Sequence, residues 1–99
     1  MPYKDKQKLY EKQAQHRNAN KKRMWDYLVE HPCVDCGIND PRVLEFDHVR
    51  DIKSYNVARM VTGSTFSWKR IQEEIDKCDV RCSNCHTLRH YVENGYYQP

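Results

Sequence analysis

Four of the five cysteines in this sequence have the spacing of a metal site. They form two C-x-x-C pairs, Cys33 with Cys36 and Cys82 with Cys85, and 45 residues lie between the pairs. A C-x-x-C turn lets two sulfurs reach one tetrahedral ion, so the two pairs together predict a structural Zn²⁺ held by four thiolates. The fifth cysteine, Cys78, is expected to be a buried thiol.

Disulfide bonds are the alternative use of these cysteines. The sequence opens with polar residues, so we expect no signal peptide, and it has no apolar run long enough to span a membrane. We therefore expect a cytoplasmic protein without membrane contact, in which thiols stay reduced and bind metal in preference to forming disulfides.

A carboxylate and three imidazoles form a second group of residues that could bind a metal. Asp47 and His48 are consecutive within the segment that the cysteine pairs enclose, and His86 directly follows Cys85. His86 and His90 are four residues apart, so a helix would present both on one face. Carboxylate and imidazole ligands suit Mg²⁺, Mn²⁺, Zn²⁺ or Ni²⁺, which predicts a second metal, separate from the zinc and open to water. In the alternative interpretation His86 merely lies beside a structural zinc site, and the histidine pair occurs by chance.

The composition predicts one small α+β domain that needs a metal staple. Of 99 residues, 38% are hydrophobic and 31% are charged, which is too little apolar material for a large core. We expect three segments, namely a basic helical arm at residues 1–30, a zinc-stapled domain at 31–95 and a tail at 96–99.

The arm is expected to be helical over residues 4–30, which contain no Gly or Pro, and to stop at His31-Pro32. Residues 1–23 carry a net charge of +6 and the remainder carries −3. Such an arm favours nucleic acid as a partner, because contacts with phosphates release counterions. The alternative is a solvated helix that only keeps the protein soluble. We expect the first half of the helix to be exposed and Trp25, in the second half, to lie in the core.

The element that carries Asp47 is predicted to be a strand over residues 43–49. Alternation along a regular strand would direct Asp47 and His48 to opposite faces. For both to serve one site, the strand would have to end or distort there.

The other elements follow from local signals. We expect a short helix at 56–61, a helix from Ser67 as N-cap to about 77, a short strand at 79–81 and a final helix from 84 to 94 that Gly95 ends. On the helix that starts after Ser67, apolar residues are predicted to share one face, and five charged residues are predicted to point outward: Lys69, Arg70, Glu73, Glu74 and Asp76.

Three separated motifs resemble one known family. The resemblance covers roughly residues 30 to 92 and includes Trp68. The motifs are Cys33-Val34-Asp35-Cys36-Gly37, Leu44-Glu45-Phe46-Asp47-His48-Val49 and Glu74-Ile75-Asp76-Lys77-Cys78-Asp79-Val80-Arg81-Cys82-Ser83-Asn84-Cys85-His86. In this order they resemble the zinc-containing HNH endonucleases that are frequent in phages and bacteria. The resemblance implies a ββα-metal fold, in which two antiparallel strands and a helix surround one catalytic metal, and a protein of the bacterial or host cytoplasm.

The resemblance also implies roles for individual residues. Asp47 matches the metal ligand on the strand, His48 the general base and His86 the metal ligand on the helix. His90 matches a further ligand that only some members have. The four paired cysteines match the structural zinc ligands. At the position of the family's middle asparagine, which braces the loop that holds the base, this sequence has Lys77; Asn56 or Asp79 could substitute.

The implied activity is metal-dependent hydrolysis of a DNA phosphodiester, as an endonuclease or a nickase. A neutral imidazole can accept the proton of the attacking water if its other nitrogen is held, most simply by a backbone carbonyl. One divalent metal (Mg²⁺, Mn²⁺, Ni²⁺ or Zn²⁺) would assist, and the protein would act as a monomer or weak dimer, with a protein partner as a possible means of targeting. Six basic residues are candidates for contacts with the DNA backbone: Lys21, Lys22, Arg23, Arg50, Lys53 and Arg89.

Two other function classes compete with the nuclease. A non-catalytic zinc module would bind nucleic acid or a protein through its basic arm, and would leave Asp47, His48 and His86 as incidental polar residues. A thiol redox protein is disfavoured, because no βαβ pattern surrounds either C-x-x-C pair.

Overall fold

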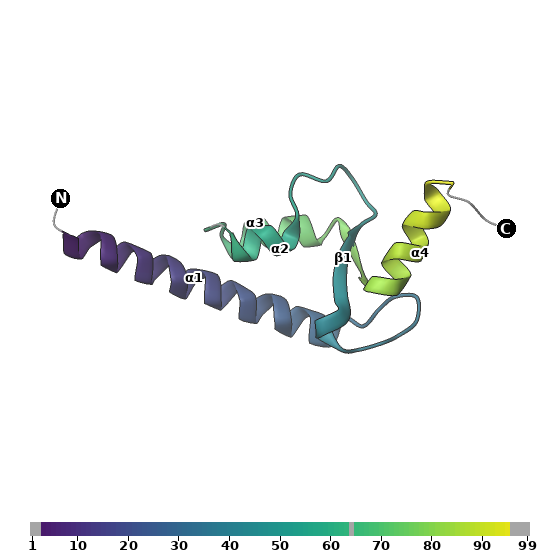
Figure 1. The fold of residues 1–99 in the computed structure, drawn as a ribbon, viewed down its shortest axis with the longest axis horizontal. Helices are drawn as coiled ribbons and strands as arrows, with labels where there is room; N and C mark the ends of the chain where they lie inside the picture. The colour runs from purple at the N-terminus through teal and green to yellow at the C-terminus, as the bar shows by residue number, and fades with distance from the viewer. Residues whose placement is uncertain (1–2, 64, 96–99) are drawn as a thin grey trace.

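The computed structural model describes residues 3–63 and 65–95, with side chains from residue 6 onward. The predicted tail at 96–99 lies outside this range. In chain order the elements are α1, a 3₁₀ turn η1, β1, α2, α3, β2 and α4 (Figure 1). Helices combined with one two-stranded antiparallel sheet confirm the predicted α+β class.

Helix α1 spans Tyr3–Glu30 and is the longest element. It ends immediately before His31-Pro32, as predicted. The side chains of residues 6–12 are exposed, and this end of α1 extends beyond the other helices (Figure 1). Farther along, His16 Nε2 lies 2.8 Å and Asn20 Nδ2 lies 3.0 Å from the backbone oxygen of Phe66. The second half of α1 therefore packs on the folded body, whereas the start of the helix is exposed, as expected.

The sheet consists of β1, Leu44–His48, and β2, Cys78–Cys82. The strands are antiparallel, and their register runs from Leu44 opposite Cys82 to His48 opposite Cys78 without a bulge. The strand that carries Asp47 is thus regular to its last residue, and the distortion that would bring Asp47 and His48 to one side is absent. Before β1, η1 spans Pro41–Val43 and is capped by Asp40.

Three helices complete the fold. Helix α2 spans Val57–Thr62, α3 spans Trp68–Ile75 and α4 spans Ser83–Glu93. Ser67 caps α3 as predicted, and its hydroxyl accepts a hydrogen bond from the N–H of Arg70 at 3.2 Å. Helix α3 stops at Ile75 rather than near 77, since Cys78 already pairs in β2. Viewed as in Figure 1, α2 and α3 lie on one side of β1 and α4 on the other.

Two small cores hold these elements together. The first contains residues of α2 and α3 together with Cys78, and the second contains Leu28, Leu44, Val80 and two of the paired cysteines. Met24, Tyr27 and Phe46 pack against both cores and so join α1 to the sheet. Trp25 is 47% exposed, so the prediction that it lies in the core was wrong. Met24 and Leu28 occupy the inward face of α1, and Trp25 projects from its flank.

Among the helices that the structure describes, none combines the length and the apolar character needed to cross a lipid bilayer.

Candidate metal centres and the cavity beside them

The four paired cysteines meet at one end of the sheet. Their sulfurs all lie within 4.8 Å of one another, and Cys36 Sγ is 3.8 Å from Cys82 Sγ. Tetrahedral Zn²⁺ with Zn–S bonds of about 2.3 Å would separate its sulfurs by about 3.8 Å, so the spacing fits zinc. The first pair is shaped by a turn in which Gly37 adopts φ = 78°, where a side chain would be strained. The second pair begins α4, and Cys82 is its N-cap.

The sulfurs of this four-cysteine cluster differ in acidity. Burial raises the pKa of the Cys33 thiol, but hydrogen bonds from backbone N–H groups, that of Cys36 first among them, outweigh burial and lower the pKa to about 6. The pKa of the Cys85 thiol is raised to about 12, chiefly by its hydrogen bond with Cys82 and by burial. Four cysteine sulfurs this close together could hold one structural metal ion, and four thiolates are the usual ligand set of structural zinc.

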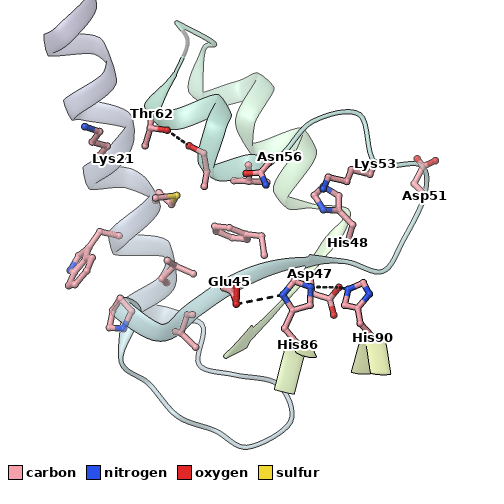
Figure 2. A pocket seen from close by; sticks show the side chains of 18 residues that line it. Lys21, Glu45, Asp47, His48, Asp51, Lys53, Asn56, Thr62, His86 and His90 are labelled. Atoms are coloured by element: carbon pink, nitrogen blue, oxygen red, sulfur yellow. Dashed lines mark hydrogen bonds and ion pairs between the residues drawn. The ribbon is translucent and has the colours of Figure 1, made fainter. Parts of the chain in front are cut away.

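Asp47, His86 and His90 form a second cluster of potential ligands, again with donor atoms within 4.8 Å of one another. Asp47 is 1% exposed. Its Oδ1 is 3.4 Å from His86 Nε2 and 3.6 Å from His90 Nε2. Figure 2 shows both imidazoles, one turn apart on α4, directed toward the carboxylate. The spacing and the chemistry of this Asp47–His86–His90 cluster fit a divalent metal with one oxygen and two nitrogen ligands.

Two guanidinium groups also contact Asp47. Arg89 Nη1 lies 2.8 Å and 2.9 Å from the two carboxylate oxygens, and Arg81 Nη1 lies 3.1 Å from Oδ2. Arg89 was predicted to contact DNA, but here it bridges Asp47 and Glu93. We expected no role for Arg81 from the sequence. Its contact with Asp47 could have been predicted from its place in β2, since the antiparallel pairing brings it to the same face of the sheet as Asp47.

His48 faces away from this cluster. Its Nε2 is 3.1 Å from Glu74 Oε1 on α3, across the sheet from Asp47. In Figure 2 His48 lies with Lys53 and Asn56 on one side of β1, while Asp47, His86 and His90 lie on the other. A carboxylate, and not the expected backbone carbonyl, therefore holds the ring of His48.

Glu74 is 3% exposed, so the prediction that it points outward was wrong. Its burial could have been predicted from its position in the sequence. Glu74 follows Ile71 by three residues and precedes Cys78 by four, and both of these are buried. Helical spacing places Glu74 with Ile71 on the inward face of α3, and Cys78, the first residue of β2, packs in the same core as Ile71. The charge of Glu74 obscured this in the sequence.

Lys77, at the position where the resembling family has asparagine, secures the segment after His48. Its ammonium group lies 2.9 Å from the backbone oxygen of Ile52 and 3.1 Å from Ser54 Oγ. Its own carbonyl accepts hydrogen bonds from the N–H groups of Val49 and Arg50, both at 3.0 Å. Lys77 itself thus braces this segment. Of the two proposed substitutes, Asp79 also contacts this segment, since it pairs with Arg50 at 2.8 Å, whereas Asn56 caps α2.

A cavity of about 780 Å³ connects the two faces of β1. All five residues of β1 line it, and so do residues of α1, α2 and α4. His48 and the Asp47–His86–His90 cluster thus border the same space, although they lie on opposite faces of the strand. The remaining wall includes Met24 and Trp25 from α1, and Asn56 and Val57 at the start of α2.

The six basic residues predicted to contact DNA fall into two groups. Lys21 and Lys53 are exposed and line the cavity, and none of the contacts described for this structure involves them. The other four are engaged within the protein. Lys22 pairs with Asp26, Arg23 contacts Asn20, and the contacts of Arg50 and Arg89 are those given above. The two lysines are the cations that remain available to a ligand in the cavity.

Comparison of the chain with family models, with curated proteins and with solved structures found no match.

Proposed function

We propose that this protein is a metal-dependent DNA endonuclease or nickase of the HNH type. One observation carries the proposal. The antiparallel pair β1–β2, followed by α4, brings Asp47, His86 and His90 within coordinating distance of one another, and the resulting cluster borders the same cavity as His48. A zinc ribbon needs only its cysteines and gives no reason for this second group of ligands.

In this proposal each residue at the cavity has a separate task. His48 accepts the proton of the water that attacks phosphorus. A divalent cation held by Asp47, His86 and His90 would bind the scissile phosphate and offset the charge that develops on its oxygens. Lys21 and Lys53 contact neighbouring phosphates of the DNA backbone. The zinc held by Cys33, Cys36, Cys82 and Cys85 fixes the start of α4, and with it the position of His86.

The test is cleavage of supercoiled plasmid by the purified protein with Mg²⁺, Mn²⁺, Ni²⁺ or Zn²⁺ in turn. We expect conversion to nicked or linear DNA with at least one metal, and a loss of about 10²-fold or more in His48→Ala. His31→Ala is the matched control, because His31 is an exposed histidine that stacks on Tyr27 and lies outside the cavity. If no metal raises cleavage above the His48→Ala level, the proposal fails.

The competing function is a zinc module that binds nucleic acid without cutting it. It is favoured by the ion pairs of Asp47 with Arg81 and Arg89, which satisfy this buried carboxylate without any metal. Two measurements distinguish the two functions. A module would bind DNA equally well with and without His86, and would show no second divalent metal per chain beyond the zinc.

A further inference from the structure

Glu74 is the buried group with the most contacts outside the clusters described above. Its Oε1 accepts hydrogen bonds from the N–H groups of Ser54 and Tyr55, at 2.9 Å and 3.1 Å, and lies 3.1 Å from His48 Nε2. Its Oε2 pairs with the ammonium group of Lys77 at 2.9 Å. One carboxylate therefore joins α3 to the end of β1 and to the segment that follows it.

These contacts determine which nitrogen of His48 carries the hydrogen. Burial raises the pKa of Glu74, but the hydrogen bond from Lys77 and those from two backbone N–H groups lower it to about 2. An ionised carboxylate only accepts hydrogen bonds, so Nε2 of His48 must donate. In the neutral ring Nδ1 is then the nitrogen with a free lone pair. No contact described for this structure involves His48 Nδ1.

We propose that Glu74 is the positioning residue for His48: its carboxylate holds the imidazole in one orientation and one tautomer, with Nδ1 as the atom that receives the proton. This inference rests on the function proposed above. It adds a residue to which the resemblance assigns no role, and it replaces the backbone carbonyl that we expected to hold the ring.

Lys77 provides a matched control for this role. It contacts the same segment at Ile52 and Ser54, and it contacts Glu74 only at Oε2, whereas His48 contacts the other oxygen, Oε1. Removing Lys77 loosens the segment, whereas removing Glu74 loosens the segment and also frees the ring. Glu74→Gln is the second control, because the amide oxygen can still accept from His48 and from the two backbone N–H groups.

The experiment compares wild type, Glu74→Ala, Glu74→Gln and Lys77→Met, each zinc-loaded and shown to be folded by circular dichroism. Plasmid nicking yields kcat and KM. In Glu74→Ala we expect kcat to fall at least about tenfold with KM changed less than about threefold, because a displaced catalytic group costs turnover more than binding. In Glu74→Gln and Lys77→Met we expect kcat to stay closer to wild type than to Glu74→Ala.

Nitrogen-15 NMR of the His48 ring reads the tautomer without any cleavage. In wild type and Glu74→Gln, Nε2 should show the shift of a protonated nitrogen and Nδ1 that of an unprotonated one. In Glu74→Ala both nitrogens should move toward the averaged values of a ring that exchanges between tautomers. A Glu74→Ala protein with wild-type kcat and an unchanged tautomer would overturn the inference. So would a Lys77→Met protein that loses as much kcat as Glu74→Ala.

The two proposals fail in different ways. If the wild type cuts no DNA but the tautomer of His48 is fixed by Glu74, the nuclease function is wrong and no catalytic step remains for Glu74 to assist. If the wild type cuts DNA while its His48 ring already exchanges between tautomers, the function stands and the role of Glu74 is wrong.

Discussion

Asp47 and His48 are neighbours in the sequence, but their side chains leave β1 from opposite faces and contact different helices. Asp47 contacts His86, Arg89 and His90 of α4, whereas His48 contacts Glu74 of α3. Both residues border one cavity. The two halves of the proposed site are therefore held by different helices, and each can be altered without disturbing the other.

The first prediction follows from this separation. His86→Ala should weaken binding of Mn²⁺ or Ni²⁺ at the second site by at least about tenfold, because it removes one of three ligands. His48→Ala should leave that affinity unchanged. Titration calorimetry on zinc-loaded protein measures both. Equal weakening in the two variants would contradict the division of β1 into two faces.

The second prediction concerns the cysteines. Cys82→Ser should lose its zinc and unfold at neutral pH, since the free energy of binding structural zinc is also free energy of folding. Cys78→Ala should keep one zinc per chain, because Cys78 lies in the other core. Burial there is the main reason why the pKa of its thiol is raised to about 12. Elemental analysis and circular dichroism provide the two readouts. Zinc loss in Cys78→Ala would show that the fifth cysteine is a ligand.

The third prediction concerns the charge of Asp47. Asp47→Asn should lower the free energy of unfolding by about 1–3 kcal/mol, because Arg81 and Arg89 would lose their buried partner but keep Asp35 and Glu93. Asp35→Asn is the control, since Asp35 also pairs with Arg81 but its side chain is 46% exposed. That change should cost less than about 1 kcal/mol. Urea denaturation with excess zinc measures both, and similar losses would mean that Asp47 is not an electrostatic anchor.

The fourth prediction is a pH dependence that belongs to Glu74. Its pKa is about 2 in the folded protein against 4.5 for an ordinary glutamate. The carboxylate therefore contributes stability above pH 4.5, by about 3 kcal/mol, and loses it as the pH falls from 4.5 toward 2.

This contribution is measured as the difference in unfolding free energy between wild type and Glu74→Gln. Both proteins are compared with the same excess of zinc at each pH, so that the pH dependence of zinc binding is common to both. The difference should be constant from pH 7 to 4.5 and shrink below. A difference that stays constant from pH 7 down to about pH 3 would indicate that the pKa of Glu74 in the folded protein is near the ordinary value.

Much of this architecture could be predicted from local signals in the sequence. The end of α1 at His31-Pro32, the Ser67 cap and the grouping of the four paired cysteines all depend on neighbouring residues or on one repeated motif. The regular alternation of β1 was also predictable, and so was its consequence that Asp47 and His48 face apart. The expectation that the strand would distort arose from the implied catalytic roles and not from the residues.

The errors concern side chains whose environment is set by tertiary packing. Trp25 has the size of a core residue, but the inward face of α1 is filled by Met24 and Leu28. Glu74 has the charge of a surface residue, but three donors from distant parts of the chain, together with the nearby Lys77, satisfy it. Partners separated by 20 or more residues, as Glu74 is from Ser54, leave no local trace. The contacts of Arg81 and Arg89 with Asp47 were not predicted, for the same reason.

Because Cys85 and His86 are consecutive in α4 but belong to different clusters, the chain cannot vary in length there. One residue inserted between them would rotate the rest of the helix by about 100°, and would carry His86 and His90 away from Asp47 while leaving the sulfurs in place. The connection between α2 and α3 carries no ligand of either cluster, although Phe66 contacts α1, and lengthening a surface loop costs little. Insertions should therefore be tolerated better between these two helices than within the first two turns of α4.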